Sequence, residues 1–324
     1  LKVEECVIDN AQGGGMYLNG DMSKMIIHRN TVSNTKGTNN YSAGIVFGCV
    51  RLLDFDQVYK PFEEIALGER LSNPHDVVVY DNIVYKSNSS GIYSDGAYKL
   101  YLVNNTSYLN DKEGMCLDGG SFGCYVANNT LKQNGGRRRQ TMEDLVNDYV
   151  GDFGTLDDGS SPAKLPGLSM DNAAYNIITD NNICNNYGSG VKIVRSGARN
   201  IIINNAITDN NVGESASWHF FGIELAYAAK PDYEIANIDF KSCYENIIAR
   251  NIIRGEHYAG IFLAEECYIN DFFDNVIMGP TWWSMECLSD KFNSTANNIS
   301  DISSRGIDSS NATGGVYVFP GVAD

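Results

Sequence analysis

Three aspartates stand at the same position of a repeated five-residue segment. The segment opens with glycine, and its fifth residue is Asp95, Asp118 or Asp171 in three successive copies. If the copies stack, these carboxylates lie roughly 5 Å apart, a spacing that suits a retaining glycosidase, whereas a wider pair suits an inverting one. Stacked carboxylates also supply the hard oxygen ligands that Ca²⁺ prefers. The alternative is turn chemistry, because Asp95 and Asp118 both precede glycine.

Charged residues continue this pattern in the next two copies. Lys192 and Glu224 occupy the third position of their segments, and Arg195 directly follows the segment that contains Lys192. Glu224 is an alternative catalytic acid. Lys192 and Arg195 could hold a sugar or, in a lyase, remove the proton beside a uronate carboxylate.

Further candidates for sugar contact lie in or beside these segments. They are His219, His257, Tyr93, Tyr187, Trp218, Arg138 and Lys164. The two histidines stand three residues before a segment glycine and could donate to sugar hydroxyls, or be structural. The aromatic rings could stack on pyranose rings. Arg138 lies in a basic run that could recognise an acidic glycan, although such runs are usually just solvated.

The segments that carry these residues share one apolar pattern. The residues one and three places after the glycine are apolar in every copy except for Ser94, while those two and four places after it vary. Alternation with a period of two is typical of a β-strand with one face in a core. The eight copies open at Gly15, Gly44, Gly91, Gly114, Gly167, Gly190, Gly222 and Gly260.

An asparagine element precedes each glycine segment and recurs mostly every 23 or 24 residues, as from Asn82 to Asn105 and on to Asn129. Asparagine tolerates the left-handed conformation at a bend, and its amide can bond the amides above and below it. We therefore predict an internal asparagine ladder. Its members would be Asn30, Asn82, Asn105, Asn129, Asn182, Asn205, Asn251 and Asn275.

Together the two repeats resemble the right-handed parallel β-helix proteins of the pectate-lyase-like superfamily, over roughly residues 1–290. The resemblance implies an all-β, single-stranded solenoid of about ten coils. It also implies that the glycine strands form the first sheet and that the asparagine bend joins the second and third. The superfamily includes lyases, glycoside hydrolases, epimerases and phage tailspikes, so the resemblance alone does not give the activity. The Gly-His-Gly and Arg-Ile-Lys signatures of polygalacturonases are absent, and no specific family is identified.

The repeat predicts one β-helix domain over residues 1–292 and a C-terminal cap or tail over 293–324. Long insertions break the repeat only beside the glycine strands, where they would wall a groove. They span residues 49–73, 134–165, 210–220 and 228–242. A capping box at Thr141 predicts a short helix in the second insertion.

The net charge of −16 and the pI near 4.6 make nucleic acid and anionic membranes poor partners. No apolar run approaches the roughly 20 residues of a membrane helix. Eight cysteines are spread singly, so we expect buried thiols, with Cys243 and Cys267 on neighbouring coils. Disulfides are the alternative. The cysteines therefore do not decide between a reducing and an oxidising compartment. Leu1 already lies in a strand pattern, which indicates a trimmed N-terminus.

These observations predict a carbohydrate-active enzyme that cleaves glycosidic bonds of an oligo- or polysaccharide, acting outside the cell or on its surface. Hydrolysis or transglycosylation would use Asp118 and Asp171, tuned by Asp95, with no required cofactor. One alternative is a Ca²⁺-dependent lyase, with the three aspartates as ligands and Lys192 or Arg195 as base. The other is a non-catalytic glycan-binding adhesin or tailspike-like protein. The sequence leaves homotrimer formation open.

Overall fold

The structure is a computed structural model. It describes residues 1–37, 40–48, 66–136, 165–211, 221–226, 243–255, 257–264, 267–279, 283–289, 292–295 and 297–300. The predicted helix at Thr141 and most of the four predicted insertions lie outside the described residues.

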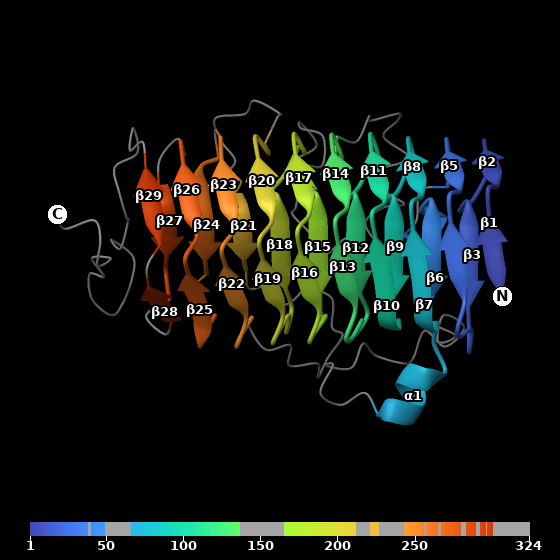
Figure 1. Ribbon diagram of the computed structural model, residues 1–324, viewed down its shortest axis with the longest axis horizontal. Coiled ribbons are helices and arrows are strands. Elements are labelled where there is room, and N and C mark those ends of the chain that lie inside the picture. Colours follow the sequence, from blue (N-terminus) through green and yellow to red (C-terminus); the bar gives the residue numbers. More distant parts are fainter. Residues whose placement is uncertain are drawn as a thin grey trace, which may run out of the picture.

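The described chain winds into three parallel sheets that run side by side along the long axis (Figure 1). Sheet A contains β1 (Lys2–Glu4), β4 (Ile26–His28), β7 (His75–Tyr80), β10 (Tyr98–Val103), β13 (Tyr125–Ala127), β16 (Ile177–Thr179), β19 (Ile201–Ile203), β22 (Ile247–Ala249), β25 (Asn270–Phe273) and β28 (Phe292–Thr295). Sheet B contains β2 (Val7–Asp9), β5 (Thr31–Ser33), β8 (Ile83–Tyr85), β11 (Thr106–Tyr108), β14 (Thr130–Lys132), β17 (Asn182–Cys184), β20 (Ala206–Thr208), β23 (Ile252–Arg254), β26 (Val276–Met278) and β29 (Asn298–Ser300).

Sheet C holds the glycine segments. Its strands are β3 (Met16–Asn19), β6 (Ile45–Gly48), β9 (Ile92–Asp95), β12 (Met115–Asp118), β15 (Leu168–Asp171), β18 (Val191–Val194), β21 (Phe221–Leu225), β24 (Ala259–Leu263) and β27 (Trp283–Cys287). Each coil runs through sheets C, A and B in turn, so each strand pairs with the equivalent strand of the coils before and after it. The predicted all-β parallel β-helix of about ten coils is confirmed.

The core of the solenoid is built from the inward residues of all three sheets. In β12 the side chains of Met115 and Leu117 are buried in this core, whereas Cys116 and Asp118 alternate with them on the outward face. Met115 pairs in register with Ile92 on one side and Leu168 on the other. The two-residue period thus stacks apolar side chains into columns, and burial of these columns stabilises every coil against its neighbours.

An asparagine ladder joins the coils at the bend between sheets A and B. The Asn105 side chain donates to Asn129 Oδ1 (3.1 Å), and the Asn105 backbone N–H donates to the same oxygen (2.8 Å). The predicted ladder is confirmed with one correction: its member in the sixth coil is Asn181, whereas Asn182 is exposed and begins β17. Of two adjacent asparagines, only the one at the bend can point inward.

Two further ladders, which the repeat did not predict, lie at the other bends. Each links the amide of one asparagine to Oδ1 of the next. One contains Asn110, Asn134, Asn186 and Asn210; the other contains Asn176, Asn200, Asn246 and Asn270. Because a buried amide without partners is costly, these ladders satisfy polar groups at all three corners.

The coil extends further than predicted. Strand β28 pairs with β25, and β29 pairs with β26, so sheet A continues to Thr295 and sheet B to Ser300, past the predicted domain end at residue 292. The element order places each predicted insertion immediately before or after a strand of sheet C. A short helix, α1 (Leu67–Leu71), and a 3₁₀ turn, Asn40–Ser42, also lie beside strands of sheet C in the chain.

Helix α1 is fixed to the turns between sheets C and A. Arg70 is buried, donates to the Gly120 carbonyl (3.1 Å) and stacks on the Phe122 ring. Just after the helix, the Asn73 amide donates to the Gly96 carbonyl (2.9 Å). These contacts hold the described end of the first insertion against the coils that carry Asp95 and Asp118.

The described cysteines are not joined by disulfides. Cys243 and Cys267 are buried beside Tyr244 and Tyr268, which pair on neighbouring coils, so the predicted stacking of these thiols is confirmed. No helix in the described ranges has the length and apolar character needed to cross a membrane.

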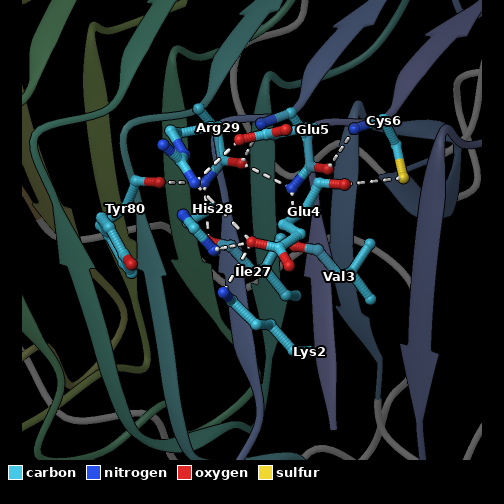
Figure 2. A network of polar contacts seen from close by, with 11 residues as sticks. Lys2, Val3, Glu4, Glu5, Cys6, Ile27, His28, Arg29 and Tyr80 are labelled. Atoms are coloured by element: carbon cyan, nitrogen blue, oxygen red, sulfur yellow. Dashed lines mark hydrogen bonds and ion pairs between the residues drawn. The ribbon is translucent and has the colours of Figure 1, made fainter.

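A network of charged side chains ties the first coil to the second on the outside of sheet A (Figure 2). Glu4 contacts Lys2 (2.6 Å) and His28 Nε2 (2.9 Å) through one carboxylate oxygen. The hydrogen bond from Lys2 is the main cause that lowers the pKa of Glu4. The His28 ring also stacks on the Tyr80 ring of the next coil, with ring centroids 4.6 Å apart. The network therefore pins the terminal strand β1, which has only one neighbour.

Candidate functional site

The outward face of sheet C aligns the predicted chemical groups on adjacent coils. Asp95 pairs in register with Asp118, and Leu117 pairs with Met170, so Asp171 follows on the next coil. A second column lies beside this one, and its members pair in register along the whole sheet. It contains Tyr17, Val46, Tyr93, Cys116, Ser169, Lys192, Glu224, Phe262 and Glu286.

Asp118 is held by two donors. The Tyr93 hydroxyl donates to Asp118 Oδ2 (2.9 Å), and the Gly119 N–H donates to Oδ1 (2.6 Å). Only 6% of Asp118 is exposed. The second bond is the turn contact expected of an aspartate before glycine, but the tyrosine bond across the coil goes beyond turn chemistry. The carboxylate is therefore fixed in orientation at a nearly buried position.

Asp95 lies on the preceding coil and packs against the turn after Asp118. Tyr41 donates its hydroxyl proton to Asp95 Oδ2 (2.6 Å). Gly119 has a φ of +60°, and a Cβ there would lie 1.7 Å from Asp95 Oδ1. Glycine is required at this turn both by the left-handed backbone and by the approach of the Asp95 carboxylate.

Asp171 carries a carboxyl group with a strongly raised pKa. Arg195, the residue after β18, donates from Nε to Asp171 Oδ1 (2.5 Å) and from Nη2 to Oδ2. Burial raises the pKa of Asp171 to about 7; the charge of Asp118 acts in the same direction, while Arg195 and Lys192 oppose it. Asp171 therefore exchanges a proton near neutrality, as a general acid or base must.

Glu224 and Lys192 form a second ion pair on the next two coils. Lys192 Nζ lies 3.0 Å from Glu224 Oε1, and the Ser189 hydroxyl donates to Glu224 Oε2 (2.7 Å). Only 8% of Glu224 is exposed. Lys192 and Arg195, which were predicted to hold a sugar, are thus both paired with carboxylates of the same face.

A chain of tyrosines supports the aspartates, and one of its members was missed from the sequence. Tyr41 contacts Tyr17 and Tyr93 edge to face, with centroids 6.3 and 5.8 Å away. Tyr93 was predicted to stack on a sugar ring, which requires an exposed ring face. Only 2% of Tyr93 is exposed, so it positions Asp118 instead. Tyr41 stands three residues before Gly44, the same place in the repeat as Tyr187 and the two histidines, and that position could have identified it.

The prediction that His257 contacts substrate is wrong. Its side chain is 1% exposed, and Nε2 accepts a hydrogen bond from the backbone N–H of Asn210 (3.3 Å), so it continues one of the asparagine ladders. Burial lowers the pKa of His257 to about 4. Tyr187 is half-buried and lies against Gly136. The other predicted contacts, His219, Trp218, Arg138 and Lys164, lie outside the described residues.

The described part of the chain contains no cluster of side chains typical of a metal site. No group of three His, Cys, Asp or Glu side chains in the described residues could hold a metal ion. Both oxygens of Asp171 face Arg195, and both oxygens of Asp118 accept hydrogen bonds from Tyr93 and Gly119. In this arrangement the oxygens of Asp118 and Asp171 are engaged by protein donors, so a calcium ion would have to compete with these donors.

Comparisons with known proteins agree with the geometry of the fold. The family described as "Right handed beta helix region" matches residues 1–140. No curated protein sequence matches the chain. Among solved structures, a double mutant of the periplasmic alginate epimerase AlgG is similar, with 15% identity, a TM-score of 0.58, and coverage of 94% of this chain and 68% of the epimerase chain.

Two other solved structures are similar over most of the chain. An alginate lyase from Paenibacillus sp. str. FPU-7 has 9% identity, a TM-score of 0.56, and coverage of 95% of this chain and 90% of the lyase. XylC in complex with xylose has 10% identity, a TM-score of 0.52, and coverage of 87% of this chain and 38% of XylC. At these identities the likeness shows the fold alone: the protein is a right-handed parallel β-helix.

Proposed function

We propose that the protein is a carbohydrate-active enzyme that cleaves glycosidic bonds on the outward face of sheet C. The observation that carries this proposal is the row of three aspartates on successive coils, of which Asp95 and Asp118 are buried and Asp171 has a pKa of about 7. Structural neighbours named as alginate epimerase, alginate lyase and a xylose complex support an action on carbohydrate. The proposal places this action outside the cytoplasm, which the neighbour named as a periplasmic epimerase supports.

The proposed reaction is hydrolysis or transglycosylation. Asp171, protonated at slightly acidic pH, donates a proton to the leaving oxygen, and Arg195 holds its carboxyl group in place. Asp118 on the adjacent coil is the partner carboxylate, oriented by Tyr93 and Gly119. Strands of neighbouring coils lie about 4.8 Å apart, which is close to the carboxylate separation of retaining enzymes. Asp95, next in the row, adds negative charge that favours protonation in its surroundings.

The test is the turnover of two variants on a panel of neutral and uronate-containing glycans. Asp118→Asn and Asp171→Asn keep the shape of each side chain, and each should lower turnover by about 10²-fold or more. Asp81→Asn is the matched control, because Asp81 is an exposed aspartate at a bend between sheets A and B. Wild-type rates in both site variants would refute the assignment.

The same panel separates hydrolysis from elimination. Release of reducing ends without ultraviolet absorbance indicates hydrolysis, whereas unsaturated products that absorb in the ultraviolet indicate a lyase. Chelator should leave turnover unchanged, because hydrolysis by a pair of carboxyl groups requires no metal ion. Binding without turnover in the wild type would favour a glycan-binding protein instead.

A further inference from the structure

The outward face of sheet C is acidic even though two basic side chains lie on it. At the outward strand positions and the residue that follows each strand, the described charged groups are five carboxylates and two cations. The carboxylates belong to Asp95, Asp118, Asp171, Glu224 and Glu286, and the cations to Lys192 and Arg195. The whole chain is acidic as well, with a net charge of −16.

Both cations of this face are already engaged by its own carboxylates. Lys192 lies 3.0 Å from Glu224, whose other oxygen accepts from Ser189. Arg195 donates from two of its nitrogens to both oxygens of Asp171. A carboxylate on a sugar would have to displace one of these partners and leave a nearly buried acid without its cation, which is costly.

An exposed aromatic ring on the same face suits a different ligand. Tyr17 is 45% exposed, and the hydroxyl end of its ring lies against Gly48, where a Cβ would come 2.6 Å from the tyrosine hydroxyl. The Tyr41 ring meets it edge on. A pyranose ring presents C–H groups on one face, and these stack on aromatic rings without any need for charge.

From these observations we propose that the face binds a neutral glycan rather than a polyuronate, with Tyr17 as a stacking position. The inference rests on the proposed function, because it concerns the substrate of the same site. It separates this protein from neighbours that are named for alginate, a polyuronate. The physical reason is that, among the described residues of this face, a polyanion would find both cations already paired and would meet an excess of negative charge.

The first experiment measures binding to a matched pair of polymers, polygalacturonate and its carboxyl-reduced form, by affinity electrophoresis at two salt concentrations. The carboxyl-reduced polymer should bind about tenfold more tightly, and added salt should strengthen binding of polygalacturonate by screening repulsion. Tighter binding of polygalacturonate, weakened by salt, would overturn the inference, as would a failure to bind any neutral polymer of a wider panel. If neutral polymers bind but are never cleaved, the proposed catalysis fails and the inference stands.

A variant that releases one cation gives an independent test. Glu224→Gln removes the carboxylate that pairs with Lys192, so affinity for polygalacturonate should rise about fivefold, the factor that corresponds to one exposed ion pair. Ser189→Ala is the matched control, since it removes a hydrogen bond to Glu224 without any change of charge. Equal polygalacturonate affinity in both variants would contradict the assigned role of the Lys192–Glu224 pair.

The stacking position is tested by Tyr17→Ala. Tyr17 is the most N-terminal outward residue of sheet C and contributes little to the buried core. The variant should weaken binding of the carboxyl-reduced polymer about tenfold and leave the melting temperature within a few degrees of wild type. Unchanged affinity would remove Tyr17 from the site.

Discussion

The protonation of Asp171 links the candidate site to the stability of the fold. Burial raises the pKa of this carboxyl group from its ordinary value of 3.8 to about 7 in the folded chain. Between these two values the folded state holds a proton that the unfolded state has released. The free energy of unfolding therefore falls as pH rises from about 4 to about 7, by roughly 1.4 kcal/mol per pH unit and on the order of 4 kcal/mol in all.

Asp171→Asn abolishes this titration, so the variant isolates its contribution. Urea denaturation of both proteins between pH 4 and pH 8 gives the difference in the free energy of unfolding, wild type minus variant. That difference should shrink as pH rises and become constant above about pH 7. The Arg195 ion pair needs no separate pH-dependent correction, because its effect is already contained in the folded-state pKa of Asp171, which it lowers.

The opposite slope would refute the reasoning. A difference that grows with pH would mean that Arg195 outweighs burial and holds the folded carboxylate in its charged form. Arg195→Gln provides the cross-check, because Arg195 is the strongest influence that lowers the pKa of Asp171. In the Arg195→Gln variant the free energy of unfolding should continue to fall at pH values above neutrality. In the Asp171→Asn/Arg195→Gln double variant this pH dependence should be absent.

Two further predictions concern the solenoid itself. Asn181→Ala removes the acceptor of two hydrogen bonds from Asn129 and the donor of two others, and should lower the free energy of unfolding by about 2–5 kcal/mol. The neighbouring Asn182→Ala should change the free energy of unfolding by less than about 0.5 kcal/mol. Equal losses in the two variants would contradict the assignment of Asn181 to the ladder. Glu4→Gln removes the carboxylate charge shared by Lys2 and His28 at the open end of sheet A. Backbone amides of β1 should then exchange hydrogen faster, while those of β12 stay protected. Unchanged exchange in β1 would show that the network in Figure 2 does not hold the first coil.

Local sequence periodicity was sufficient to predict the fold and the alignment of the three aspartates. A glycine strand with period two, repeated with an asparagine bend, has few ways to bury its apolar face except by stacking coil on coil. Once the coils stack, Asp95 and Asp118 must face the same way. The error at Asn182 arose because two adjacent asparagines satisfy the same spacing, and only the backbone conformation at the bend selects Asn181.

The partners of each side chain depended on the tertiary structure, since partners come from other coils. Sequence alone assigned Lys192 and Arg195 to a ligand, but the structure pairs them with Glu224 and Asp171. His257 follows the same spacing as a rim residue, yet its ring turns inward to meet Asn210. Repetition therefore determines which face a residue occupies, whereas charge pairing and burial, which set its chemistry, are decided only where coils and turns meet in space.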